Sequence, residues 1–296
     1  MNKRLAIGLL SGVLTCLASL PSAIAQEPEE AAAGIVVSSG IEGGGYWSAA
    51  SRLKNVANEL GLNTRVQPST GSIHNLEQLT DPNSPVNLAF AQADALRYYL
   101  NDHPGVEAQI EALENIGQEC VFVITGKTSA IGTDADLQKS ANHRLGIASA
   151  DSGVAVTFQY MASQLAGLKN TRVVFGDTAA ALQGINSEQA SVDAVMVVHR
   201  PREHSAEVDM VLQQPDRYRF VEIVSERLTD EGGRGEAVYQ SLNLAMPAAA
   251  DGERPRVRTI CVKGLLLANR EKLNLEQRDQ LSQLVNQYWM RVYATE

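Results

Sequence analysis

The stretch GIVVSSGIEGGGYWSAASRLKNVANEL, residues 34–60, decides the fold class. It opens with a short β-rich run at 34–39, and a glycine-containing loop follows at 40–45. Beyond this loop the apolar residues return at helical spacing, at Ala49, Leu53, Val56, Ala57 and Leu60. A strand, a glycine loop and a helix in this order predict a βα unit.

The same alternation continues along the chain. Further strands are expected at 64–66, 86–91, 120–125, 144–148, 173–175, 194–198 and 259–267. Helices are expected at 73–79, 94–100, 106–113, 154–166, 178–185 and 275–293. Alternating strands and helices predict an α/β protein whose mostly parallel sheets are covered by helices on both faces. A mature chain of about 270 residues fits two lobes of ordinary size better than a single core.

Residues 1–25 have the layout of a secretory signal peptide. Lys3 and Arg4 precede an apolar run at 5–20, and the small residues Ala23 and Ala25 mark a cleavage site. A membrane anchor, the alternative, needs roughly 20 apolar residues, and Pro21 with the acidic segment after it stops the run short. We therefore expect export to the periplasm and cleavage after Ala25.

The charge excludes one class of partner. Residues 1–25 hold two basic and no acidic residues, which leaves 23 Lys and Arg against 34 Asp and Glu, a formal charge of −11. Such a surface repels phosphate backbones and no basic stripe offsets it, so nucleic-acid binding is excluded. No later segment approaches the apolar length of a membrane span, so we expect a soluble protein after export.

Loops before three of the expected helices, at 43–45, 69–72 and 149–153, contain glycine. Glycine lets a ligand approach the backbone, and a helix N-terminus presents unpaired N–H groups with a positive partial charge, which suits carboxylates and phosphates. Ligands of open α/β sheets bind beyond the carboxyl ends of strands, so the three loops are expected to share a cleft. Taken alone, each loop is equally compatible with a plain strand-to-helix turn.

The side chains near these loops have alternative roles. Tyr46 and Trp47 suit either an aromatic cover for an apolar part of the ligand or packing onto the sheet. Gln92 has little structural reason to be polar at a strand end and is the better ligand contact, whereas Asp94 is also explained as a helix cap. His199 and Arg200 end a later strand. Arg200 is the candidate for bidentate carboxylate recognition, and a solvated salt bridge is its alternative.

Enzyme motifs are missing from the sequence. It contains no G-x-S-x-G elbow, no H-E-x-x-H helix, no P-loop and no dinucleotide-binding fingerprint. Two cysteines remain after residue 25, Cys120 and Cys261, without the C-x-x-C spacing of zinc or redox sites. We expect a binding protein rather than an enzyme, with no catalytic residue, no metal ligand and no cofactor.

Five segments in register resemble the TAXI family of TRAP-transporter substrate-binding proteins. They are 43–47 (GGGYW), 69–76 (STGSIHNL), 88–94 (LAFAQAD), 145–157 (LGIASADSGVAVT) and 258–268 (RTICVKGLLLA). The chain departs from the family at 198–201 (VHRP), where members usually read Gly-Leu-Pro, and at Val154 and Ala155, where they read Gly-Thr. These departures concern the ligand more than the fold.

The resemblance implies a type II periplasmic-binding-protein fold, two α/β lobes joined by crossing strands with the ligand in the cleft between them. We place lobe 1 at 26–125 and 226–296 and lobe 2 at 126–225. The resemblance implies a monomeric receptor that captures a small anionic solute, a carboxylate or an amino acid, and delivers it to integral-membrane TRAP permease subunits. A sensor module for a signalling receptor and a periplasmic hydrolase are the alternatives. The expected ligand-binding residues are Gly44, Gly45, Tyr46, Trp47, Ser69, Thr70, Gly71, Ser72, Gln92, Asp94, Asp151, Ser152, Gly153, Thr157, His199 and Arg200.

The resemblance also places the strands that hold Cys120 and Cys261 close together, near the hinge. In an oxidising compartment two such cysteines can form a disulfide if their Cα atoms lie within roughly 7 Å. Both also lie in β-rich runs, where free cysteine is commonly a buried apolar residue. A disulfide and a pair of buried thiols therefore both remain open.

Overall fold

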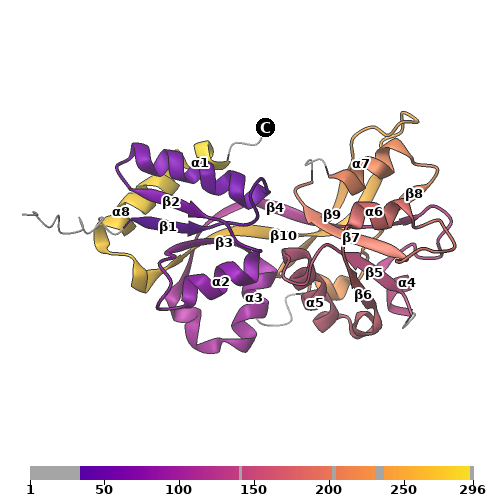
Figure 1. Cartoon of the computed structure of the whole chain (residues 1–296), viewed down its shortest axis with the longest axis horizontal. Helices are drawn as coiled ribbons and strands as arrows, with labels where there is room; N and C mark the ends of the chain where they lie inside the picture. Colours follow the sequence, from indigo (N-terminus) through magenta and orange to yellow (C-terminus); the bar gives the residue numbers. More distant parts are fainter. Residues whose placement is uncertain (1–33, 140–141, 202–204, 231–236, 294–296) are drawn as a thin grey trace, which may run out of the picture. The chain divides into compact units, whose positions relative to one another are not determined.

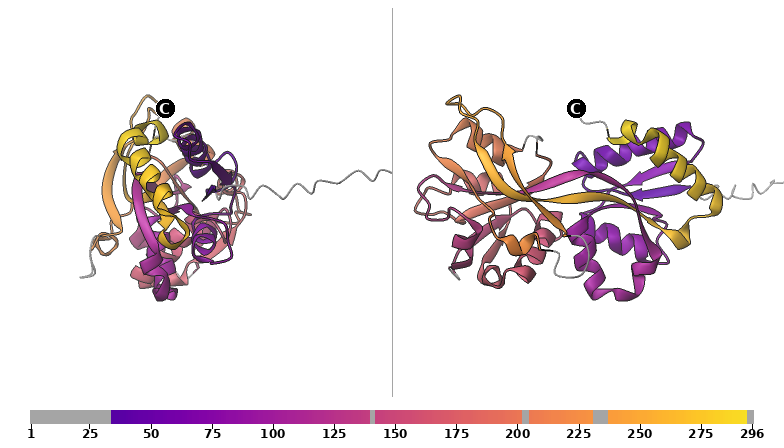
Figure 2. Two further views of the ribbon diagram at one scale, coloured as in Figure 1. Left: turned by 90° about the vertical axis from the view of Figure 1, so that its left-hand side faces the viewer. Right: turned by 180° about the vertical axis from the view of Figure 1, so that it is seen from behind.

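Two long strands, β4 (Ile110–Gly126) and β10 (Arg256–Asn269), run through both halves of the sheet (Figure 1). The computed structural model describes residues 34–139, 142–201, 205–230 and 237–293, so the expected signal peptide and its cleavage site lie outside the described residues. β4 and β10 pair antiparallel with each other, and each has one set of partners in the first half and another in the second. Continuous strands therefore join the two halves, as the view from behind also shows (Figure 2).

The first half is a parallel three-stranded sheet beside the crossing pair, in the order β2-β1-β3-β10-β4. Its other strands are β1 (Ile35–Ser38), β2 (Thr64–Gln67) and β3 (Leu88–Gln92). Its helices are α1 (Gly45–Glu59), α2 (Ser72–Thr80), α3 (Ala93–Asp102), α8 (Leu275–Gln283) and α9 (Trp289–Tyr293), with a π-helical turn at Leu284–Tyr288. Alternation along β1 decides which helix covers which face. Ile35 and Val37 pack with Leu53 of α1, while Val36 packs with Leu76 of α2.

The second half continues from β4 in the order β4-β7-β5-β6. Its other strands are β5 (Arg144–Ile147), β6 (Arg172–Phe175), β7 (Ala194–His199), β8 (Tyr218–Val221) and β9 (Tyr239–Ala245). Its helices are α4 (Asp134–Lys139), α5 (Gly153–Gln164), α6 (Thr178–Gln183) and α7 (Ala206–Gln213). Alternate residues of β4 supply two separate cores, Val121 and Val123 on one face and Phe122 and Ile124 on the other. Within the described residues no helix is both long and apolar enough to span a membrane.

The structure confirms the α/β fold class and corrects one local element. A helix expected at 106–113 is wrong: a 3-10 turn at Pro104–Gln109 leads directly into β4, because pairing with β10 from Ile110 onward overrides the local helical pattern. Further along the chain, Tyr239 and Ile260 share a core with Val121 of the second half. Only the part of β10 from Gly264 onward pairs with β3 of the first half.

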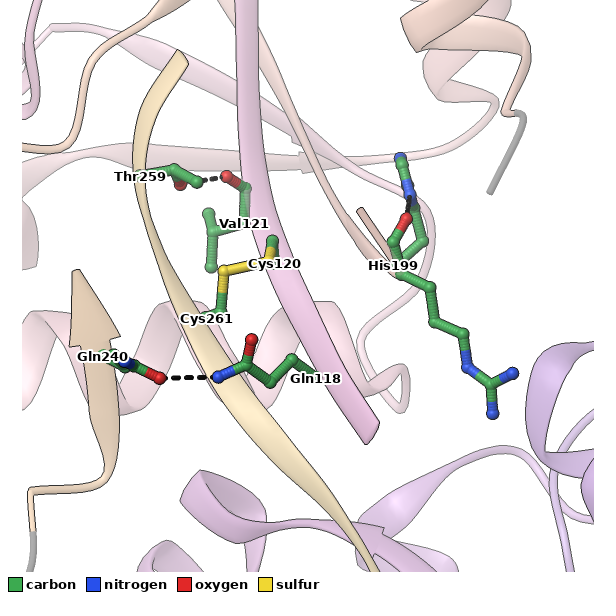
Figure 3. Close-up of a disulfide and its surroundings, with 8 residues drawn as sticks. Gln118, Cys120, Val121, His199, Gln240, Thr259 and Cys261 are labelled. Carbon is green, nitrogen blue, oxygen red and sulfur yellow. Dashed lines mark hydrogen bonds between the residues drawn. A yellow bond between two sulfur atoms is a disulfide. The ribbon is translucent and has the colours of Figure 1, made fainter. Parts of the chain in front are cut away.

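Cys120 and Cys261 face each other across the β4–β10 pair and are joined by a disulfide, with their Cα atoms 3.9 Å apart. The bond lies where the crossing strands change partners, because Cys120 also pairs with His199 of β7 and Cys261 with Gln240 of β9 (Figure 3). Both cysteines are buried, 0% and 1% exposed. The disulfide therefore holds the register of the two strands at the point where they pass from one half to the other.

Replacing both Cys120 and Cys261 with Ala is expected to lower the free energy of unfolding. The bond closes a loop with a sequence separation of 141 residues, for which the chain-entropy model gives at most about 4–5 kcal/mol. Denaturant unfolding of oxidised wild type, reduced wild type and the double variant measures the loss. Intact-mass analysis after alkylation without reductant is the control, and two alkylated thiols would show that the bond is absent.

Lys272 ties the C-terminal part of the chain to the loop between α2 and β3. Its ammonium donates to the carbonyl oxygens of Gln78 at 3.2 Å, Asp81 at 2.6 Å, Ser84 at 3.1 Å and Val86 at 3.2 Å. Partial burial lowers the pKa of this ammonium, and the Asp81 carboxylate opposes that shift. An ammonium has three N–H donors, so the four carbonyls share them and hold the loop against residue 272.

Lys272→Met should leave these carbonyls without their donor. Hydrogen bonds to a charged group contribute about 1.5–3 kcal/mol, so we expect the free energy of unfolding to fall by about 2 kcal/mol. Lys54→Met on the exposed face of α1 is the matched control, with an expected change within about 0.5 kcal/mol. Equal losses in the two variants, measured by denaturant titration, would contradict a specific role for Lys272.

Candidate functional site

The N-termini of α2, α3 and α5 meet where the first and second halves touch. Gly71, the residue before α2, has a φ of 148°, which L side chains rarely adopt, and a methyl group there would lie 2.9 Å from the carbonyl oxygen of Asp151. The backbone N–H of Gln92, the residue before α3, donates to Ser72 Oγ at 3.2 Å. The first turns of α2 and α3 carry no side-chain cap. Helix N–H groups of the first half therefore face the loop before α5.

Gln92 lies at the centre of this junction. It is 3% exposed, and its side-chain oxygen Oε1 is buried without a hydrogen-bond partner. A methyl group on Gly153, the first residue of α5, would overlap that oxygen, so the Gln92 side chain packs directly against the start of α5. A buried polar group without a partner costs about 1–3 kcal/mol. The unmet hydrogen bond marks this junction as the candidate binding site.

Asp94, in contrast, is fully satisfied. It is 0% exposed, its Oδ2 accepts from Thr157 Oγ1 at 2.7 Å and from Tyr239 OH at 2.8 Å, and its Oδ1 accepts from the N–H of Ala95 at 2.8 Å. Burial raises the pKa of the carboxyl above its ordinary value, and the bonds from Thr157 and Tyr239 partly oppose that effect. Because α3 belongs to the first half and both hydroxyl donors to the second, Asp94 bonds the halves together.

Tyr46 covers the same region from α1. Its ring stacks on Phe90 of β3, with the ring centroids 5.7 Å apart, and its hydroxyl is buried. Burial, followed by the carboxylates of Glu119 and Asp94, raises the pKa of Tyr46 well above its ordinary value. The phenol therefore stays protonated at neutral pH and keeps its O–H donor.

The two loops at the junction have their own internal bonds. Ser69 Oγ accepts from the N–H of Gly71 at 3.3 Å, which shapes the turn before α2. Ser152 caps α5 by accepting from the N–H of Ala155 at 3.2 Å, as an N-cap serine does. Thr70 and Asp151 are exposed, so the polar groups that face the other half come mainly from the backbone and from Ser72.

His199 and Arg200 lie at the hinge rather than among the helix N-termini. The His199 ring stacks on Phe122, with the ring centroids 4.6 Å apart. His199 is the partner of Cys120 in the β4–β7 pairing (Figure 3). Arg200 Nη2 donates to the carbonyl oxygen of Ile116 on β4 at 3.3 Å. This bond crosses from the end of β7 in the second half to the part of β4 that pairs within the first half.

The structure brings together about half of the expected ligand-binding residues. Gly71, Ser72, Gln92, Asp94, Gly153 and Thr157 meet at the junction, with Tyr46 above them. Gly44, Gly45 and Trp47 lie at the start of α1. The expected set did not include Tyr239 or Glu119. Neither has a local signal, because Tyr239 reaches Asp94 across 145 residues of sequence.

A separate polar cavity of about 560 Å³ lies in the second half, between the end of β4 and the segment around Asp216. Its lining includes Lys127, Asn186 and Arg217, none of which belongs to the expected site. Among the described residues no three or more His, Cys, Asp or Glu side chains are grouped to hold a metal ion.

No protein-family model and no curated protein matches the chain. The structure is similar to XAC2383 from Xanthomonas citri bound to ATP, with a TM-score of 0.50 and 11% identity, over 86% of this chain and 82% of that one. It is also similar to the B. pertussis BvgS periplasmic domain (TM-score 0.44, 12% identity), over 89% of this chain but only 42% of that one. A third match is the periplasmic binding protein of an arginine transport system from Legionella pneumophila (TM-score 0.43, 12% identity), over 88% of this chain and 98% of that one. The chain spans less than half of the BvgS structure, and identities this low concern the fold alone.

The Asp94 carboxyl should make stability depend on pH. Its pKa in the folded protein is raised above 3.8, so the folded state favours the protonated form. The corresponding stability is present below the unfolded-state pKa of about 4 and is lost as pH rises through the folded-state pKa. Asp94→Asn removes this titration. The Tm of wild type minus that of Asp94→Asn should therefore fall as pH rises from about 3.5 and then level off. A constant difference would contradict the raised pKa, and Asp102→Asn on the exposed end of α3 is the control.

Proposed function

We propose that this protein binds a small solute where the N-termini of α2, α3 and α5 meet, and that its two halves close on that solute. The observation that carries this proposal is the buried, unpartnered side-chain oxygen of Gln92 beside the N-termini of α2 and α3, which have no side-chain cap. A ligand that donates to the Gln92 oxygen and accepts from the nearby backbone N–H groups supplies the hydrogen-bond partners that the oxygen and the N–H groups lack. The Gln92 side-chain amide can turn over, so that its nitrogen takes the place of its oxygen. In that orientation Gln92 donates to an acceptor group of the ligand equally well.

The site favours an anionic solute, a carboxylate or an amino acid. Helix N-termini carry positive partial charge, and the first turn of α2 contains no acidic residue. The one acidic residue in the first turn of α3, Asp94, is already held by Thr157 and Tyr239. Arg200 at the hinge supplies a full positive charge on the second half, and its planar guanidinium suits a carboxylate.

The crossing strands suit a clamp. β4 and β10 are continuous through both halves, so small changes in their backbone torsions near Cys120 and Cys261 rotate one half against the other. A ligand that contacts both halves favours the closed population. Binding without a chemical step accounts for the absence of catalytic motifs in the sequence, and the protein acts as a binding protein rather than an enzyme.

The protein delivers its solute to a membrane permease of the TRAP type, as a periplasmic receptor of the TAXI kind. Support comes from the five segments that resemble that family and from the signal-peptide pattern of residues 1–25. The junction found in the structure contains parts of three of these segments, through Ser72, Gln92 and Gly153. The integral-membrane permease subunits are therefore the expected partners, and the receptor acts as a monomer.

Thermal-shift screening against dicarboxylates, amino acids and oxoacids is the direct test. A solute at 100 times its Kd stabilises the protein by about 2.7 kcal/mol, and the same solute should reduce the radius of gyration in solution scattering. Gln92→Leu keeps the side-chain volume but removes the amide, so affinity should fall by at least about tenfold. Gln183→Leu on the exposed face of α6 is the matched control.

Arg200→Ala tests the charge of the solute. Loss of a buried charge pair with a carboxylate should weaken binding by about 2–5 kcal/mol. Unchanged affinity would remove Arg200 from the site. A solute that binds without compaction would contradict the clamp, and tight binding of cations but not of anions would contradict the proposed ligand class.

A further inference from the structure

One carboxyl bonds the two halves through side chains. Asp94 is the second residue of α3, which directly follows β3 of the first half. Thr157 lies in α5, and Tyr239 begins β9, both in the second half. The two hydroxyls donate to the same oxygen, Asp94 Oδ2, at 2.7 Å and 2.8 Å. Two charge-assisted bonds therefore converge on one atom from across the junction.

All three residues are inaccessible to water in this arrangement. Asp94 and Thr157 are 0% exposed and Tyr239 is 2% exposed. A carboxylate in such surroundings needs its hydrogen bonds, because an unpaired buried charge is strongly unfavourable. When the halves separate, water replaces both hydroxyl donors. The bonds thus exist in the closed arrangement and are exchanged for water in an open one.

The donors are held on the second half, and the acceptor on the first. Tyr239 pairs with Val262 in the β9–β10 ladder, its ring meets Tyr160 of α5 edge-on at 5.7 Å, and its hydroxyl lies 3.4 Å from the carbonyl oxygen of Thr157. Asp94 is held by its bond to the N–H of Ala95. The two hydroxyl donors and the carboxyl acceptor are therefore each held in position by their own half. Rotation about the crossing strands makes or breaks both hydrogen bonds together.

We propose that Asp94, Thr157 and Tyr239 form a closure latch that sets the ratio of open to closed protein and thereby the apparent affinity for the solute. The link to affinity rests on the proposed function, whereas the latch acts in the protein without solute. Because the apparent Kd is the intrinsic Kd divided by the closed fraction, any variant that opens the latch weakens binding without touching the solute. Tyr239 acts here as a positioning residue.

Pairs of spin labels at Lys54→Cys in the first half and Glu188→Cys in the second, both exposed, report the opening of the full mature chain without solute. Tyr239→Phe and Thr157→Val each remove one hydroxyl donor and keep the side-chain shape. Loss of a hydrogen bond to a charged group changes an equilibrium constant, here that between the open and closed protein, by a factor of about ten or more. We expect the longer-distance, open population to grow by at least about tenfold relative to the closed one in each variant.

The chain offers matched controls within each half. Tyr99→Phe removes a buried hydroxyl bonded to Thr80 Oγ1 at 2.7 Å, both in the first half. Thr125→Val removes a hydroxyl bonded to the carbonyl oxygen of Asp193 at 2.7 Å, both in the second half. These variants should lose stability yet keep the wild-type distance distribution. Should Tyr239→Phe fail to fold, Thr157→Val decides the question alone.

The outcomes separate the latch from the solute. Distance distributions of Tyr239→Phe and Thr157→Val that match wild type, or controls that open as far, overturn the latch. For each dicarboxylate, amino acid or oxoacid that stabilises wild type, Kd should rise by the factor by which the closed fraction falls. An open distribution with unchanged Kd overturns the link to affinity. Failure of the whole panel to bind counts against the proposed function, and the latch is still decided by the distances.

Discussion

The antiparallel pairing of β4 with β10 is the constraint on which the rest of the structure depends, because each strand belongs to both halves of the sheet. Residues 110–119 of β4 pair with β10 in the first half, and residues 120–126 pair with β7 and β8 in the second. The register of this pair fixes where β3 ends relative to β7. The disulfide lies at the change of partners, where Cys120 also pairs with β7 and Cys261 with β9.

The junction between the halves contains two buried polar side chains with opposite solutions to the same physical problem. Both Asp94 carboxyl oxygens are bonded, one to the N–H of Ala95 and the other to two hydroxyls of the other half. Gln92 lies two residues earlier, equally buried, and its side-chain oxygen has no partner. A buried polar group without a hydrogen bond is unfavourable. The bonded Asp94 therefore suits holding the halves together, whereas the unpartnered Gln92 suits the proposed contact with a solute. Two residues at one strand end, Gln92 and Asp94, therefore differ in whether their buried polar atoms have partners.

Both backbone and side-chain groups contribute to the electrostatics of the junction. The chain is acidic overall, with a formal net charge of −9, and the carboxylates of Glu119 and Asp94 both act on Tyr46. Helix N-termini provide positive partial charge without any basic residue, and Gly71 and Gly153 allow that backbone to come close. Local positive partial charge can in this way exist within an acidic chain.

The sequence by itself determined the local elements and their order. The continuous burial of β1 and the helical spacing of α1 come from neighbouring residues, and the loops at 69–72 and 149–153 were recognisable as helix starts. Local patterns could not show that residues 110–113 extend a strand, since only pairing with β10 decides this. Nor could they show that Tyr239 donates to Asp94 or that Gln92 remains unpartnered. Those facts depend on which elements meet in space, because a hydrogen bond between residues far apart in sequence is set by the register of the crossing strands, and register is a property of the folded sheet alone.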